Sequence, residues 1–137
     1  MANFIYGKAK QAMLNCQINF AANQYRLLLV KTSLYAINQN VDEFVSDIPL
    51  ESITARSSNI SEITNVLGII DGNDVIIEPY NGGVFEALIF YQVGSTDNNS
   101  RLIFYIDNSE GLPYTVTASN VTVTIIWSNS VNKILSL

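Results

Sequence analysis

The sequence predicts a mainly β protein: a single-domain antiparallel β-sandwich over residues 1–137, with one N-terminal helix and a second short helix. Three observations predict this fold class. Apolar and polar residues alternate with period two through most of the chain after residue 66, as in half-buried strands. Only two stretches carry helix caps, and turn residues separate the strands at intervals typical of sandwiches. The length suits one domain, and neither a repeat nor a linker divides it.

The first helix is predicted over residues 4–15, because Asn3 is a residue type that caps helices. Its apolar positions recur at helical spacing: Ile5, Ala9, Ala12 and Met13. A helix this short is not stable alone, so we expect it to pack on the sheet. Residues 24–31 follow as a strand that is apolar on both faces, which predicts a central position.

The second helix is predicted over residues 40–48. Asn40 would cap it, Glu43 occupies the capping-box position, and Pro49 would end it. The Ser- and Thr-rich residues 51–64 show no clear period, so we interpret them as a long loop with one edge strand.

The remaining chain is predicted to be β-structure. Residues 66–70 and 74–80 flank Asp71-Gly72-Asn73, and the Asp-Gly pair is a hairpin signal because such turns need positive φ. Further strands are predicted at residues 85–93, 101–107, 114–118, 121–127 and 131–135.

The composition argues against most enzymatic chemistry. The chain contains no histidine, the usual general acid and base and the commonest metal ligand. Its single cysteine, Cys16, allows no intramolecular disulfide and is interpreted as a small buried hydrophobe. No phosphate-binding glycine loop is present. We therefore expect no catalytic residue, no metal and no cofactor.

Two weaker candidates involve carboxylates. Asp71, Asn73, Asp74 and Glu78 could supply oxygens to Ca²⁺, but the spacing is not that of an EF-hand, and the hairpin turn is the preferred interpretation. Asp42 and Glu43 could serve hydrolysis, although no partner across space is identified.

Charge and hydropathy predict the class of partner. The formal net charge is −5, which argues against nucleic acid, since a nucleic-acid binder needs a basic face. No apolar run reaches the roughly 18–20 residues of a membrane span, and the first residues lack the pattern of an export signal. Only 14% of residues are charged while 48% are hydrophobic, which predicts packing against copies or partners. The expected interface residues are Phe4, Tyr6, Tyr114 and Trp127, with core packing as the alternative for each.

Several segments together resemble a family of small structural proteins of tailed-bacteriophage virions. The opening KAKQAMLN run, the DEFVSDI segment and the three late apolar strands occur in the family's order. The resembling segments are residues 6–15, 18–20, 26–30, 42–48, 87–91, 101–107 and 121–127. Residues 51–79 do not match, and Cys16 stands where the family has glycine, so the turn after the first helix is expected to differ.

The resemblance implies a virion component, and capsid decoration (a cement role) is the leading hypothesis. Such a protein would be made in the host cytoplasm, bind the major capsid protein across capsomer joints and form a homo-oligomer, with a trimer favoured by local threefold points. The alternatives are a head- or tail-fibre domain that binds a host receptor or glycan, and a hydrolase with an unrecognised carboxylate site.

Overall fold

The computed structural model describes residues 3–20, 22–128 and 134–136. Within these residues the chain forms one α-helix, three short 3₁₀ helices and ten strands, and the predicted mainly β, antiparallel fold is confirmed. The helices are α1 (Gly7–Leu14), η1 (Thr32–Leu34), η2 (Val45–Asp47) and η3 (Leu50–Ser52). The strands are β1 (Phe4–Ile5), β2 (Tyr25–Val30), β3 (Ile53–Arg56), β4 (Thr64–Val66), β5 (Ile69–Asp71), β6 (Val75–Tyr80), β7 (Ala87–Gln92), β8 (Arg101–Ile106), β9 (Val121–Ile125) and β10 (Leu135–Ser136).

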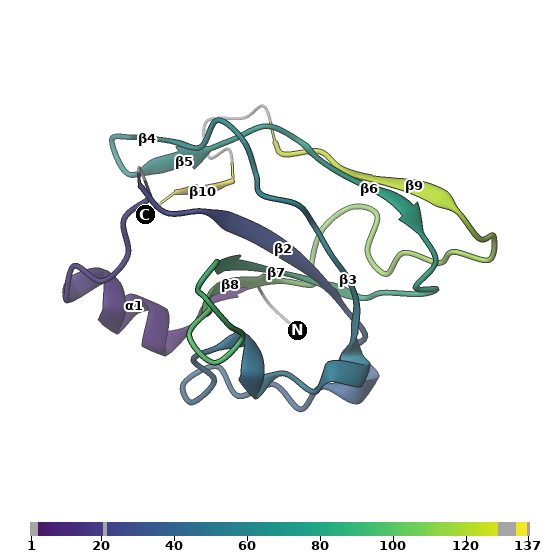
Figure 1. The fold of residues 1–137 in the computed structure, drawn as a ribbon, viewed down its shortest axis with the longest axis horizontal. Helices are drawn as coiled ribbons and strands as arrows, with labels where there is room; N and C mark the ends of the chain where they lie inside the picture. The colour runs from purple at the N-terminus through teal and green to yellow at the C-terminus, as the bar shows by residue number, and fades with distance from the viewer. Residues whose placement is uncertain (1–2, 21, 129–133, 137) are drawn as a thin grey trace.

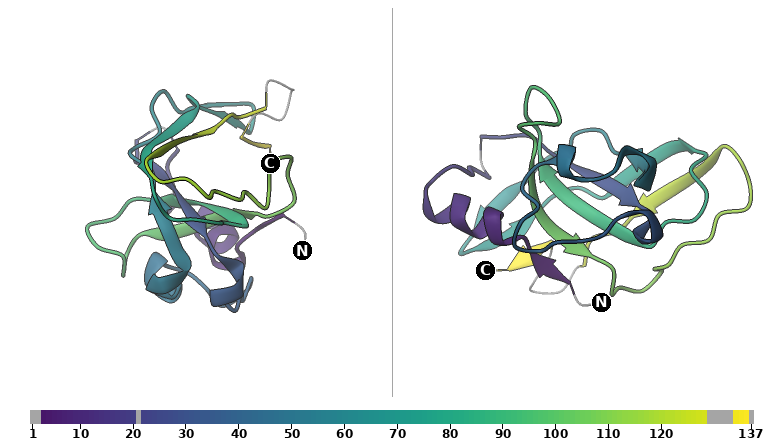
Figure 2. Two further views of the ribbon diagram at one scale, coloured as in Figure 1. Left: turned by 90° about the vertical axis from the view of Figure 1, so that its right-hand side faces the viewer. Right: turned by 90° about the horizontal axis from the view of Figure 1, so that it is seen from below.

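The strands form three antiparallel sheets. The main sheet has five strands in the order β1-β8-β7-β2-β3, and two smaller sheets have the orders β10-β5-β4 and β6-β9. The smaller sheets lie together over one face of the main sheet, joined by the chain from β5 to β6 (Figure 1). Helix α1 and the 3₁₀ segments lie toward the other side of the main sheet (Figures 1 and 2). The predicted sandwich therefore has a split second layer.

The central strands of the main sheet are buried on both faces. Five of the six residues of β2 and five of the six of β7 are buried, and four of β8 are. Alternation would leave one face polar, whereas continuous apolar runs are typical of strands covered on both sides. The central position predicted for residues 24–31 is confirmed, since β2 pairs with both β7 and β3.

An aromatic stack crosses the face of the main sheet that the smaller sheets cover. Phe20, Tyr25, Phe90 and Phe104 stack in series, with successive ring centroids 5.2, 5.2 and 4.7 Å apart. The last three rings come from β2, β7 and β8, so the stack runs across the strands. Aromatic pairs of this kind contribute about 0.5–1.5 kcal/mol each beyond the area they bury.

A buried polar network supports the opposite face. The Tyr35 hydroxyl donates to Asp42 Oδ2, and the Tyr6 hydroxyl lies 3.2 Å from that of Tyr35. The backbone N–H of Asn38 donates to the same carboxylate oxygen at 3.0 Å. Burial raises the pKa of Tyr6 and of Tyr35 well above the usual tyrosine value, so both remain protonated donors. The network ties the long segment between β2 and η2 to Tyr6, the residue between β1 and α1.

The N-terminal helix is shorter than predicted. It begins at Gly7, because Phe4 and Ile5 instead pair with Tyr105 and Phe104 as an edge strand. Asn3 does not cap it: its side-chain oxygen accepts from the backbone N–H groups of residues 107 and 108, at 3.0 and 2.9 Å. These two residues form a strand instead of a helical turn because their pairing provides hydrogen-bond partners for the backbone groups at the edge of β8.

The turn after α1 holds Cys16 in a conformation that glycine adopts more easily. The N–H of Gln17 donates to the Ala12 carbonyl at 2.9 Å, and that of Cys16 to Met13 at 3.2 Å, which is a Schellman motif. Cys16 has φ +58°, the left-handed conformation that favours glycine. The expectation that Cys16 is buried is wrong, since its side chain is exposed.

The predicted helix over residues 40–48 is also wrong. The segment contains only the single 3₁₀ turn η2, and Asn40 caps nothing there. The side chain of Asp47 accepts from the N–H groups of residues 43 and 44, both at 2.9 Å, while Glu43 accepts from Arg101 at 3.1 Å. The Asp47 carboxylate therefore stabilises the short turn, and the Glu43 carboxylate forms an ion pair. Neither caps a longer helix.

The predicted hairpin at Asp71-Gly72-Asn73 does not form. The hairpin turn lies earlier, at Leu67 and Gly68, which join β4 to β5. Both residues have positive φ angles, 52° and 78°. Strand β6 pairs with the distant β9 instead. Gly72 lies in a tight space, because a Cβ there would approach Ile60 Cγ2 to 3.1 Å.

The three strands predicted at the end of the chain have different outcomes. Residues 114–118 form no strand, since only Tyr114 makes an isolated bridge, to Phe85. Residues 121–127 form a strand as predicted, although it ends at Ile125. The last predicted strand, 131–135, falls partly outside the described residues; β10 occupies Leu135–Ser136. Among the described residues, no helix has the length and apolar character needed to cross a membrane.

Replacing Cys16 with glycine should stabilise the protein. Glycine adopts the left-handed conformation without strain, so we expect Cys16→Gly to raise the free energy of unfolding by about 0.5–1 kcal/mol. Urea unfolding followed by circular dichroism measures it. Cys16→Ala is the matched control, because it removes the thiol but keeps the strained backbone. A gain for glycine no larger than that for alanine would contradict the assignment.

Removing the Tyr35 hydroxyl should destabilise the protein. Tyr35→Phe leaves the buried Asp42 carboxylate without its side-chain donor, which costs about 1–3 kcal/mol of unfolding free energy. Tyr114→Phe is the control, because Tyr114 is exposed and its hydroxyl makes no hydrogen bond to the described residues. The control should change stability by less than about 0.5 kcal/mol. Equal effects in the two variants would show that the network contributes nothing specific.

Candidate interaction surface

The four residues predicted to form an interface have different positions in the structure. Tyr6 is fully buried and Trp127 nearly so, and both belong to the hydrophobic core. Their side chains therefore pack within the chain itself, the alternative that the sequence left open. Phe4 is half-buried and Tyr114 is exposed, so these two are available to a partner. They lie on two separate grooves.

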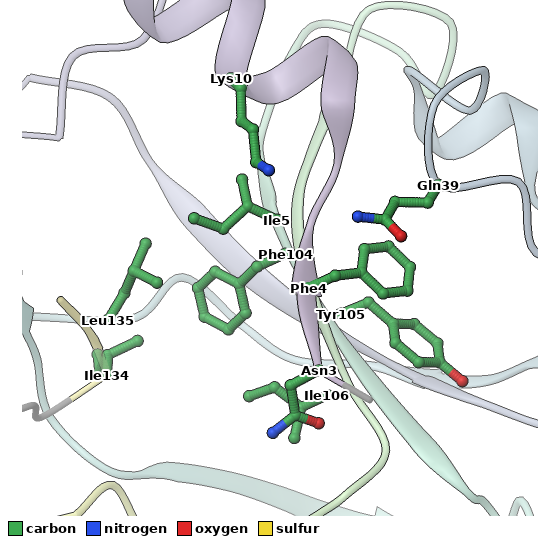
Figure 3. Close-up of a pocket in the computed structure, with 10 residues that line it drawn as sticks. All are labelled: Asn3, Phe4, Ile5, Lys10, Gln39, Phe104, Tyr105, Ile106, Ile134 and Leu135. Atoms are coloured by element: carbon green, nitrogen blue, oxygen red, sulfur yellow. The ribbon is translucent and has the colours of Figure 1, made fainter. Parts of the chain in front are cut away.

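The first groove follows the edge strand β1 and is called the β1 groove (Figure 3). It encloses about 500 Å³. Its lining residues are Asn3, Phe4, Ile5, Lys10, Gln39, Phe104, Tyr105, Ile106, Ile134 and Leu135. The walls come from β1 and β8 on one side and from the chain around β10 on the other (Figure 3). Lys10 is the one charged lining residue.

The second groove is larger and is called the β9 groove. It encloses about 610 Å³ between β9 and residues 109–114 of the connection from β8, which passes below β9 in Figure 1. Its lining residues are Phe85, Leu88, Ser109, Glu110, Gly111, Leu112, Tyr114, Val123, Thr124, Ile125, Ile126, Trp127 and Ser128. Glu110 is the only charged member, so the walls are almost entirely neutral.

Trp127 anchors the end of β9. Its backbone N–H donates to Asp74 Oδ1 and its indole N–H donates to the Asn73 carbonyl, both at 3.0 Å. These bonds close one end of the β6-β9 ribbon, because residues 73 and 74 immediately precede β6, whose first residue Val75 pairs with Ile125. The expectation of a simple turn at Asp71-Gly72-Asn73 therefore misses this role. Two of the carboxylates considered as Ca²⁺ ligands accept from backbone N–H groups here, Asp74 from Trp127 and Asp71 from Gly72.

A three-ring cluster holds the opposite wall of the groove. Phe85 stacks on Tyr114 with ring centroids 5.2 Å apart, and Tyr80 meets Phe85 edge-on at 5.7 Å. Phe85 and Tyr114 also exchange backbone hydrogen bonds of 2.9 and 3.2 Å. The Tyr80 hydroxyl donates to the Gly83 carbonyl at 2.8 Å. The connection from β8 to β9 is thus tied to the core at Tyr114.

The ion pairs between described residues lie outside both grooves. Arg56 on β3 forms a two-bond ion pair with Asp97, at 2.7 and 2.8 Å, which lowers the pKa of Asp97 below its usual value. Arg101 pairs with Glu43 and lies over the Phe44 ring. By contrast, the sequence from 111 to 132 contains no charged residue at all. In the part of the chain that the structure describes, no three His, Cys, Asp or Glu residues gather as a metal site.

The outer edge of β9 has no strand neighbour among the described residues. The ribbon consists of β6 and β9 only, and β9 pairs through its other edge. Ile126, which directly follows β9, is 69% exposed, and Ile76, on the neighbouring strand β6 opposite Thr124, is 59% exposed. Sequence reasoning singled out Tyr114 and Trp127 but missed this edge. The available signal was a charge-free, alternating strand that contains no proline or glycine.

The comparisons with known proteins identify no relative: no family model matches the chain, and no curated protein or solved structure is significantly similar to it.

Asp74 should control the environment of the single tryptophan. Asp74→Ala removes the acceptor of the Trp127 backbone N–H, so we expect the free energy of unfolding to fall by about 0.5–1.5 kcal/mol. The emission of Trp127 should shift to longer wavelength as the end of β9 loosens. Asp74→Asn keeps an oxygen in the same place and should retain both properties. Identical spectra for Asp74→Ala and the wild type would argue against the anchor.

Proposed function

We propose that this protein is a non-enzymatic structural component of a tailed-phage virion, and that it decorates the capsid as a cement protein. The proposal rests on the sequence resemblance described above and on the neutral, apolar character of the β9 groove. A surface of this kind gains free energy by leaving water and loses little by desolvating charge. That observation favours a role in assembly.

The positions of the resembling segments support the proposal. Residues 26–30, 87–91 and 101–107 coincide with β2, β7 and β8, which are adjacent in the main sheet. Residues 6–15 include α1 and residues 121–127 include β9. The resemblance therefore follows the residues that build the core and the β9 groove. The segment without resemblance, 51–79, builds mainly β3, β4, β5 and part of β6.

The mechanism in this proposal is stabilisation by mass action. A decoration protein that binds only the assembled shell lowers the free energy of that state, in proportion to the logarithm of its concentration over its dissociation constant. The partner is the major capsid protein, and the virion is the final location. Nucleic acid is not a partner in this proposal, because the sequence pI is about 4.4. The trimer favoured by capsid symmetry applies to copies bound around a local threefold point of the shell, and the copy number per particle tests it.

The proposal is tested on phage particles that carry this gene. Mass spectrometry of purified virions should find the protein in a copy number comparable to that of the capsomers. Particles from which the gene is deleted should disassemble at lower temperature, and added purified protein should restore the wild-type value. A shell whose stability is independent of the protein would sink the cement role. Presence at only a few copies, with loss of adsorption to cells, would favour the fibre-domain alternative.

A further inference from the structure

The outer edge of β9 differs from the other exposed strand edges among the described residues. β1 and β10 have two residues each, β4 has three, and β3 has four and ends in Arg56. The outer edge of β6 carries Glu78 and Pro79. Shortness, charge and proline are the features by which proteins prevent strand edges from pairing with other chains. β9 has five residues and none of these features.

We propose that β9 pairs with β9 of a second copy of this chain, antiparallel and about a two-fold axis through Val123. The two ribbons then become one four-stranded sheet in the order β6-β9-β9-β6. This inference concerns the free protein, so it goes beyond the proposed role on the capsid. Its occupant is the protein itself, for two reasons that follow.

The first reason is that β9 is complementary to itself. In a pairing centred on Val123, Val121 lies opposite Ile125 of the second copy and Thr122 lies opposite Thr124 of the second copy. β-branched residues therefore meet β-branched residues at every position, and threonines face threonines on the outward face. A two-fold axis perpendicular to the sheet also keeps the inward face of each strand on the side of its own core. Thus no buried side chain has to change sides.

The second reason is charge. Two copies each carry a formal net charge of −5, so a contact between copies is favoured where the surface is neutral. No charged residue occurs in the sequence from 111 to 132, which includes β9 and most of the β9 groove. A neutral edge also offers nothing by which a protein of opposite charge would be recognised. The exposed Ile126, directly after β9, lies beside the joint and adds apolar area to it.

The experiment compares two double variants that differ only in the sign of one charge. Thr122→Lys with Thr124→Lys places lysine opposite lysine in both cross-strand pairs of the proposed dimer. Thr122→Lys with Thr124→Glu places lysine opposite glutamate in both. The two threonines are exposed, so each variant should fold, which circular dichroism and thermal melting check. Thr64→Lys, on the exposed strand β4, is the control at another edge.

Sedimentation equilibrium over roughly a hundredfold range of concentration measures the association. We expect a monomer–dimer equilibrium for the wild type and for Thr64→Lys. The dilysine variant should raise the dissociation constant about tenfold or more, although it brings the net charge closer to zero. The lysine–glutamate variant should stay near the wild type. In the wild type, amide hydrogen exchange should show that the protection of residues 121–125 rises with protein concentration, because the fraction of dimer rises.

Three results would overturn the inference. These are a wild type that is monomeric throughout, a trimer, or a dimer that the dilysine variant leaves intact. Failure of the cement role is a separate outcome, because a protein that dimerises through β9 yet leaves capsid stability unchanged would keep this inference and lose only the proposed function. Conversely, a monomer that stabilises capsids would keep the proposed function and lose the β9 pair.

Discussion

The fold depends on covering β2, β7 and β8 on both faces. Their apolar runs leave no polar face to expose to water, so each side of the main sheet needs a layer of its own. The smaller sheets supply one layer, which meets the Phe20–Phe104 aromatic stack. Helix α1 and the 3₁₀ segments supply the other, which the Tyr6–Tyr35–Asp42 network holds in place. The sheet layer packs against stacked aromatic rings, whereas the layer of mostly irregular chain is held by side-chain hydrogen bonds.

The β9 groove is a consequence of how the second layer is divided. Two small sheets cover the main sheet instead of one wide sheet, so the layer has more strand edges than a closed sandwich would have. Most of these edges are short or carry charge or proline, and β9 is the exception. Tyr114 and Trp127 position the two sides of the β9 groove, one through its stacking on Phe85 and the other through its hydrogen bond to Asp74. A structural role for these aromatics and an interaction role for the neighbouring strand are therefore compatible.

The candidate surface was only partly predictable from the sequence. The uncharged, alternating residues 121–127 can be recognised in the text as a strand, and their neutrality can be counted. Their free edge cannot be recognised, because it depends on β6 pairing with one side of β9 and on no described strand reaching the other. Burial of Tyr6 and Trp127 was similarly hidden, since an aromatic residue has the same sequence signature in a core and at an interface.

By itself, the sequence determined the β-rich class, the central position of β2, and the strands β7, β8 and β9, because continuous or alternating apolar runs are local signals. Only the tertiary structure decided which strands pair. Phe4 and Ile5 joined the edge of β8 instead of starting a helix, and β6 joined β9 across more than forty residues instead of closing a hairpin with β5. Both outcomes depend on hydrogen bonds between segments far apart in the sequence, which no local pattern encodes.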